Sequence, residues 1–461
     1  MNNKKTGITA LILIVSACAL VSIALVVGAY FLLKAQKNYT LPTQVVTPTG
    51  VATTPAEAGT LPPEISSQMD EIQQQVITIR GLDLKNELQR DLMTPEDLKE
   101  KVINDFFKDY TNEDASRDTK ILSTLGLIDS NFDLRQFYLD LYSEQIAGYY
   151  DSETKEMYVV SGETFGGTER MTYAHEFNHA LQDQNYDLEN GLKLNDDYCE
   201  TDTEYCAAVT ALIEGDSSLT EQYWFMQYAT RQDQKDVLKF QESYTSPVYD
   251  SAPEYMKEDF LFPYLQGMDF VTSLHDSGGW QAVDKAFVHP PVSTEQILHP
   301  EKYPLDTPVV VEMPDFSGTL GSEWQELDRN VMGEWYTYLV LAKGRSAGIR
   351  MDEATAKQAA AGWAGDTYVY YSAQGTGDYL YSWCSRWETV EDMDEFFTLS
   401  KDYGVARWGE PVSSLSTEVR WNSESDGQII MRRKGSDVLW LMGSSENVVE
   451  KALTLLQDSG I

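Results

Sequence analysis

Basic residues are scarce in this sequence. Its 461 residues include 35 lysines and arginines against 73 aspartates and glutamates, so the formal net charge at pH 7 is −38. Proteins hold nucleic acids and anionic lipid headgroups through clusters of Lys and Arg. We therefore expect no DNA or RNA partner. The chain is still 42% hydrophobic, which is enough to build substantial cores and argues against a disordered chain.

Cysteine is also rare, and occurs only as Cys18, Cys199, Cys206 and Cys384. Three of these follow the apolar N-terminal segment, so at least one thiol is free or pairs between chains. Cys199 and Cys206 are close enough in the sequence to form a local disulfide. They can equally be two buried free thiols, because an uninterrupted helix between them would hold their sulfurs too far apart.

Charged residues are missing altogether from one stretch, the apolar run from residue 8 to residue 33. This run is long enough to span a bilayer with some tilt, whereas a cleaved signal peptide has an apolar region of only about 7–15 residues. We expect a retained single-pass anchor in the cell membrane, with the bulk of the chain extracytoplasmic. The alternative is a lipoprotein whose processing box, "VSAC", ends at Cys18.

Composition divides the chain into four segments. A membrane anchor spans 1–37, and a flexible Pro/Thr-rich stalk spans 38–64. Residues 65–312 show mostly helical periodicity, and residues 313–461 mix helical segments with short β-rich runs such as "YLYSWCSRW" and "VLWLMG". The predicted fold class is therefore α+β, with an N-terminal transmembrane helix, a mostly helical domain and a C-terminal α+β domain of unknown role.

A β-hairpin is predicted inside the mostly helical domain. In "AGYYDSETKEMYVVSG" two β-rich runs flank a polar turn at residues 151–155. Gly166 and Gly167 then break the chain before the next helix. The second run, "EMYVVSG", is a candidate edge strand with which an extended peptide can pair.

Two of the five histidines fall in an HExxH motif, "HEFNH". Residues four apart lie on one face of a helix, so His175 and His179 direct their imidazoles to one point, with Glu176 at the edge of that face. With so few histidines a chance match is improbable, so we expect a Zn²⁺ site rather than an ordinary polar helix face. Asp183 and Asp187, further along this helix, are expected to orient His179 or to support neighbouring loops.

Three acidic residues compete for the role of third metal ligand. Glu214 lies in "ALIEGDSSL", where a carboxylate among apolar residues is costly unless it is paired or binds a metal. Asp216 and Glu204 are the alternatives. The metzincin pattern is excluded, because it requires Gly and His where this chain has Gln182 and Asn185.

Several blocks of the sequence resemble a known family. "HEFNHALQDQ", "ALIEGD" and "PPVSTEQILHPEKY" together resemble a group of prokaryotic HExxH proteins that look like gluzincin-type zinc metallopeptidases. "GYYDSETKEMYVV" and "AAAGWAGDTYVYY" fit the same group, so the resemblance covers about residues 140–385. It implies a zincin-like catalytic domain within residues 65–312.

The resemblance also implies roles for particular residues. In gluzincins the two motif histidines and a downstream glutamate bind zinc, which carries over to His175, His179 and Glu214. The motif glutamate, here Glu176, is the general base. The thermolysin-like pattern has an aspartate four residues after the third ligand, where this chain has Ser218. The residue that orients the helix histidine is therefore left unassigned.

Zinc hydrolases also need a donor for the oxyanion that develops during the reaction. The segment "FPYLQGMDFV" resembles the tyrosine-bearing helix start of some gluzincin aminopeptidases, which nominates Tyr264. His299, in the turn "ILHP", is the alternative.

Together these features predict a membrane-anchored, extracytoplasmic zinc metallopeptidase that acts on a peptide or protein substrate. Glu176 would take a proton from zinc-activated water and pass it to the leaving amine. Two other classes are left open, namely a cell-surface binding or scaffold protein with a structural or vestigial metal site, and a zinc hydrolase of non-peptide bonds. The sequence specifies neither a cleavage preference nor an oligomeric state.

Overall fold

The described part of the chain contains both helices and strands, built around two sheets. The computed structural model describes residues 61–458, with gaps at 107–109, 146–147, 153 and 161–164. Within these residues we find no helix of the length and hydrophobicity needed to cross a bilayer. The predicted anchor (1–37) lies outside the described residues. The predicted fold class is therefore wrong in its transmembrane helix, because the described residues mix helices and strands without a membrane-spanning helix.

The smaller sheet has three strands in the order β1-β3-β2. β1 (Gln89–Met93) runs parallel to β3 (Glu156–Val160), and β2 (Gly148–Asp151) pairs with β3 as the expected antiparallel hairpin. Because β3 is the central strand, the prediction that "EMYVVSG" is an edge strand is wrong. Its second partner, β1, comes from a segment expected to be helical, and local periodicity cannot reveal a pairing between such distant segments.

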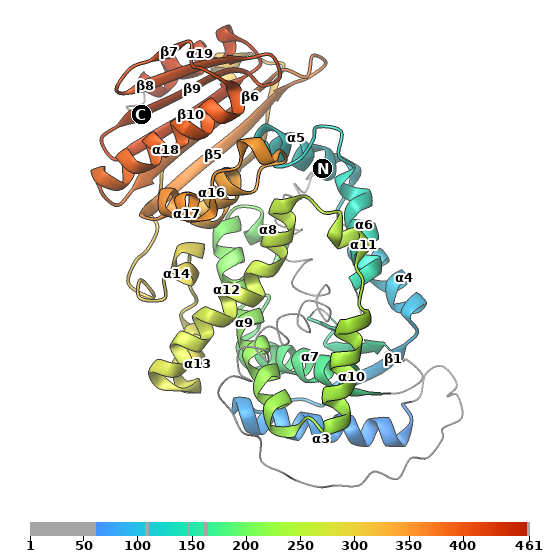
Figure 1. Cartoon of the computed structure of the whole chain (residues 1–461). Helices are drawn as coiled ribbons and strands as arrows, with labels where there is room; N and C mark the ends of the chain where they lie inside the picture. Colours follow the sequence, from blue (N-terminus) through green and yellow to red (C-terminus); the bar gives the residue numbers. More distant parts are fainter. Residues whose placement is uncertain (1–60, 107–109, 146–147, 153, 161–164, 459–461) are drawn as a thin grey trace.

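Four long helices position the candidate site, and one of them, α7, packs against β2 and β3. α3 (Pro63–Arg80) begins inside the segment predicted to be a stalk and packs beneath α7 (Gly167–Tyr186) in Figure 1. α9 (Thr203–Tyr228) and α12 (Glu254–Gly278) run side by side and form the most extensive helix pair.

Glycine permits a very close approach of α9 and α12. A Cβ atom on Gly215 would lie 2.2 Å from the carbonyl oxygen of Gly267, and a Cβ atom on Gly267 would lie 2.1 Å from the carbonyl oxygen of Ala211. No larger residue fits at either position without moving a backbone. The two helices therefore touch along their backbones at the point where α9 carries Glu214.

Shorter helices connect these elements and cover the sheets. They are α4 (Pro95–Phe106), α5 (Asn112–Thr124), α6 (Leu134–Gln145), α8 (Asp196–Cys199), α10 (Arg231–Ser243), α11 (Pro247–Asp250), α13 (Trp280–Val288), α14 (Thr294–Leu298), α15 (Ser317–Leu320), α16 (Gly333–Ala342), the 3-10 helix η1 (Ala347–Ile349) and α17 (Glu353–Ala360).

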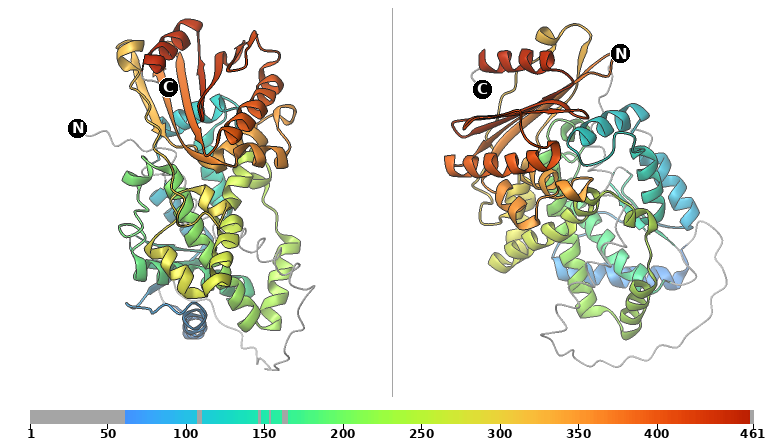
Figure 2. Two further views of the ribbon diagram at one scale, coloured as in Figure 1. Left: turned by 90° about the vertical axis from the view of Figure 1, so that its left-hand side faces the viewer. Right: turned by 45° about the horizontal axis from the view of Figure 1, so that its top comes forward.

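The larger sheet has seven strands, all antiparallel, in the order β4-β5-β6-β10-β9-β8-β7. They are β4 (Trp324–Asn330), β5 (Trp363–Ala373), β6 (Tyr379–Trp387), β7 (Ser413–Ser414), β8 (Glu418–Ser423), β9 (Gly427–Lys434) and β10 (Asp437–Gly443). α18 (Val390–Trp408) and α19 (Glu446–Asp458) cover opposite faces, as the right-hand view of Figure 2 shows. Successive side chains of β10 point to opposite faces of the sheet. Trp440 packs in the hydrophobic cluster that includes residues of α18, and Leu441 packs in the cluster that includes residues of α19.

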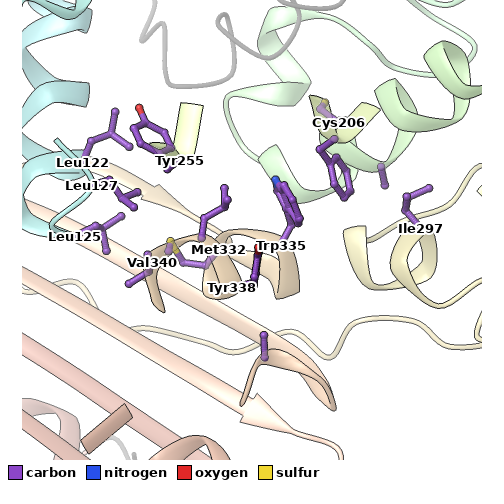
Figure 3. Packing of buried hydrophobic residues seen from close by; sticks show 14 of the residues in the cluster. Leu122, Leu125, Leu127, Cys206, Tyr255, Ile297, Met332, Trp335, Tyr338 and Val340 are labelled. Carbon is purple, nitrogen blue, oxygen red and sulfur yellow. The ribbon is translucent and has the colours of Figure 1, made fainter. Parts of the chain in front are cut away.

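One hydrophobic core extends across the predicted boundary at residues 312 and 313. Leu122 and Tyr255, from the N-terminal side, belong to the same buried cluster as Met332 and Trp335 (Figure 3). The larger sheet is therefore packed, through α16, against the helices that hold the candidate site.

The structure decides between the two alternatives for the cysteine pair. Cys199 and Cys206 form a disulfide with their Cα atoms 5.7 Å apart. The bond is possible because α8 ends at Cys199 and α9 begins only at Thr203, so no continuous helix separates the two sulfurs. Cys384 is a buried free thiol on β6.

Candidate metal centre

The HExxH motif lies in the middle of α7, which starts directly after the glycine break. The side chain of Glu169 accepts a hydrogen bond from the N–H of Gly166 at 3.0 Å and so caps the first turn. His175, Glu176 and His179 are all buried. Their candidate ligand atoms lie within 4.8 Å of one another, so the expected convergence on one point is present.

Glu214 of α9 faces the two histidines. Its Oε2 atom lies 3.2 Å from Nε2 of His175 and 3.4 Å from Nε2 of His179. Its Oε1 atom is buried and has no hydrogen-bond partner among the described residues. A buried carboxylate oxygen without a partner costs free energy, and a bound cation would remove that cost.

The two competing acids have other partners. Oδ1 of Asp216 lies 2.6 Å from Nε of Arg80, in a fully buried ion pair. Glu204, near the start of α9, accepts hydrogen bonds from the N–H and the hydroxyl of Thr294 at 2.5 and 2.7 Å. Among the three candidates, only Glu214 is brought to the histidines.

The outer nitrogen of each imidazole is also held. Nδ1 of His175 lies 2.9 Å from Oε2 of Glu221, and Nδ1 of His179 lies 2.9 Å from Oε1 of Gln182. Both partners accept, so each imidazole carries a proton on Nδ1, and its Nε2 atom faces Glu214. A histidine whose Nδ1–H is held in this way binds a metal through Nε2.

Glu221 and Gln182 were not identified from the sequence. Glu221 follows Glu214 by seven residues, which is two helical turns, so both carboxylates lie on the face of α9 that meets α7. A search for acids at helical spacing around Glu214 would have found Glu221. No comparable signal marks Gln182, whose role depends on the direction of its amide.

Asp183 and Asp187 do not orient His179. Asp183 accepts hydrogen bonds from the hydroxyl of Tyr150 and from Nζ of Lys155, both at 2.7 Å. It therefore ties the β2–β3 hairpin to α7. Asp187 ends α7 in a left-handed conformation, with φ of 54°.

The protonation of the site follows from its burial and its pairing. Burial lowers the pKa of His175 and His179, but the hydrogen bonds and charges of Glu214, with Glu221 for His175, outweigh that effect and raise both values. Burial raises the pKa of Glu214, but the two histidines more than offset it and hold the pKa at about 2. Glu214 is therefore an anion, as a metal ligand must be.

Glu176 is held at the side of the three candidate ligands by β2. Its Oε2 atom accepts a hydrogen bond from the N–H of Tyr150 at 3.0 Å. Burial raises its pKa, and the neighbouring His179 and His175 partly oppose the change. A carboxylate whose pKa is raised above its usual value is suited to accept and return a proton.

The two candidate oxyanion donors lie in different environments. Tyr264, on α12, is buried and stacks on His175 with ring centroids 6.3 Å apart. His299 caps the end of α14, where Nε2 lies 2.9 Å from Oε1 of Glu334 on α16. The structure thus brings Tyr264 to the histidines and pairs His299 with a residue of the C-terminal half.

The donor set fits zinc. Two neutral imidazole nitrogens and one carboxylate are ligands that catalytic zinc sites use, with a fourth position left for water. The orphaned Oε1 of Glu214 and the two inward-facing Nε2 atoms are consistent with a cation at their centre.

Comparison with known proteins bears on a different part of the chain. Residues 321–453 match a family described as a domain of unknown function, DUF8575. This segment contains all seven strands of the larger sheet and excludes α7 and α9. No curated protein and no solved structure was found to match the chain.

Proposed function

We propose that this protein is a zinc-dependent peptidase in which His175, His179 and Glu214 bind the metal and Glu176 is the general base. The observation that carries the proposal is the meeting of two Nε2 atoms and one carboxylate from α7 and α9, with a second buried carboxylate beside them. A structural zinc site is closed by four protein ligands, whereas the three proposed ligands leave the fourth position to water, and Glu176 is held beside them by the N–H of Tyr150.

Zinc bound there would polarise the scissile carbonyl and lower the pKa of water to about 7. Glu176 then has the task of accepting the proton of the attacking water and delivering it to the leaving amine. The N–H of Tyr150 restrains its carboxylate for this task. Tyr264, beside His175, supports the oxyanion role better than His299, whose imidazole is bonded to Glu334.

The corrected sheet order moves the expected substrate contact from β3 to β2. β2 is the outer strand next to β3 in the described sheet, and the N–H of Tyr150 points to Glu176. An extended peptide that paired with this side of β2 would pass alongside the general base. This position favours a peptide over a compact non-peptide substrate.

A location outside the cytoplasm is part of the proposal. The disulfide between Cys199 and Cys206 is the observation that supports it, because such bonds persist in oxidising compartments and are rare in the cytosol.

The test is zinc quantification and cleavage of a broad peptide library by the purified full chain. We expect one zinc per chain and cleavage that a chelator abolishes and added zinc restores. Zinc without cleavage of any peptide would instead favour the binding-protein class. Absence of zinc would refute the proposed site.

A further inference from the structure

A chain of buried hydrogen bonds leads from the end of α3 to the metal site. Arg80, the last residue of α3, donates from Nε to Oδ1 of Asp216 at 2.6 Å. Oδ2 of Asp216 accepts from Nε2 of Gln182 at 2.7 Å, and Oε1 of Gln182 lies 2.9 Å from Nδ1 of His179. The chain therefore joins three helices, α3, α9 and α7.

The amide of Gln182 can point in only one direction. Its Nε2 donates to two acceptors, Oδ2 of Asp216 and the carbonyl oxygen of Ile213 at 2.9 Å. Turning the amide would place its oxygen against both of them, which is unfavourable. Because Oε1 must then face His179, the imidazole carries its proton on Nδ1.

The second neighbour of Nδ1 does not decide the tautomer. Oγ of Ser217 lies 3.1 Å from Nδ1 of His179 and accepts from Nδ2 of Asn178. A hydroxyl can donate or accept, so Ser217 is compatible with either protonation of the ring. The choice is made by Gln182, and through it by Asp216.

We propose that Asp216, anchored by Arg80, is a positioning residue that sets the tautomer of His179 through Gln182 and so prepares its Nε2 atom for the metal. The inference rests on the proposed function. It gives Asp216 a purpose other than ligation, and it makes α3 part of the metal centre.

Asp216→Asn tests the proposal without loss of side-chain size. Arg80 would hold the new amide by its oxygen, so its NH₂ group would face Gln182 and also Asn178, whose Nδ2 atom donates to Oδ2 of Asp216 at 3.1 Å in the wild type. Gln182 is then expected to turn its oxygen to this NH₂ group and its own NH₂ group to His179, which favours the proton on Nε2.

Asp284→Asn is the matched control. Asp284 accepts from Nη1 of Arg80 at 2.7 Å and from the hydroxyl of Tyr186 at 2.9 Å. It therefore anchors the same arginine, but among the described residues it makes no hydrogen bond with Gln182. If Asp216 and Asp284 only hold Arg80 in place, both substitutions should affect His179 and its metal affinity to a similar extent. If Asp216 acts on His179 through Gln182, only Asp216→Asn should have this effect.

The measurement is the ¹H–¹⁵N correlation spectrum of the imidazole rings in the metal-free full chain, labelled only at histidine. The chain has five histidines, and a His179→Ala sample assigns the signals of interest. Wild type and Asp284→Asn should show a proton on Nδ1 of His179, and in Asp216→Asn a population should lack this proton. Cobalt affinity of Asp216→Asn should fall by about 10–100-fold.

Two further variants test the same proposal in case Asp216→Asn does not fold. Gln182→Leu removes the acceptor and should also mix the two tautomers. In Arg80→Gln/Asp216→Asn the amide at position 216 is free to turn, so the Nδ1–H form should return. An unchanged His179 tautomer in Asp216→Asn and Gln182→Leu would overturn the proposal, as would equal cobalt losses in Asp216→Asn and Asp284→Asn. The tautomer readout needs no zinc and no peptidase activity, so it stands even if the proposed function fails.

Discussion

Glu221 accepts a hydrogen bond from Nδ1 of His175 at 2.9 Å, on the side of the ring opposite Glu214. The imidazole is thus held between two carboxylates of one helix, α9. Burial raises the pKa of Glu221, and the hydrogen bond with His175 opposes this change. Glu221 therefore orients His175, a role that the thermolysin-like pattern gives to an aspartate at the position of Ser218 in this chain.

Glu221→Ala should weaken zinc binding by about 10–100-fold, because His175 loses the acceptor that fixes its tautomer and ring orientation. Glu221→Gln keeps an oxygen at this position and should lose less. Competition with a chromophoric chelator measures both affinities. Glu113→Gln, at an exposed position on α5, is the control; equal affinity in wild type and Glu221→Ala would remove Glu221 from the site.

Glu176→Gln should keep zinc and fold yet lose hydrolysis. Gln retains the shape and can still accept the hydrogen bond from Tyr150, but it cannot take up the proton of the attacking water. Loss of a general base lowers kcat by about 10²–10⁴-fold. Peptide cleavage, zinc content and circular dichroism on the same samples measure the three properties, and cleavage at the wild-type rate would show that the proposed mechanism is wrong.

Glu214→Ala should remove stoichiometric zinc from the purified chain, because only two protein ligands remain. Glu204→Gln is the matched control on the same helix, since Gln can accept the hydrogen bonds from Thr294 in the same way. Zinc content by mass spectrometry distinguishes the two variants. Full occupancy in Glu214→Ala would transfer the ligand role to another residue.

Gly215→Ala should lower the free energy of unfolding by about 1–3 kcal/mol, because the added Cβ atom would collide with the backbone of α12. The carbonyl oxygen of Gly267 lies 2.2 Å from the position of that atom. Gly318→Ala is the control, because an added Cβ there meets nothing within 4 Å. Denaturant unfolding curves should separate the two variants, and equal midpoints would mean that α9 and α12 can move apart without cost.

The comparison of strand β3 with its partners shows where sequence reasoning failed. The residues of "EMYVVSG" have high β-propensity and predict a strand, and a strand is present. Whether that strand is central or outermost depends on β1, whose register pairs Gln89 with Glu156. Pairing between segments so far apart leaves no local pattern, and residues 89–93 were expected to be helical.

What the sequence determined by itself is the local geometry of the site. Helical periodicity places His175 and His179 on one face with Glu176 beside them, whatever the rest of the fold does. The apolar surroundings of Glu214 marked it as a carboxylate in need of a partner. Tertiary structure alone decided which atoms meet. The close approach of α9 to α12, and the packing of α9 on α7, bring Glu214 and Glu221 to opposite sides of one imidazole. The direction of the Gln182 amide is decided by two acceptors on α9, because a side-chain amide has no preferred orientation until its partners are in place.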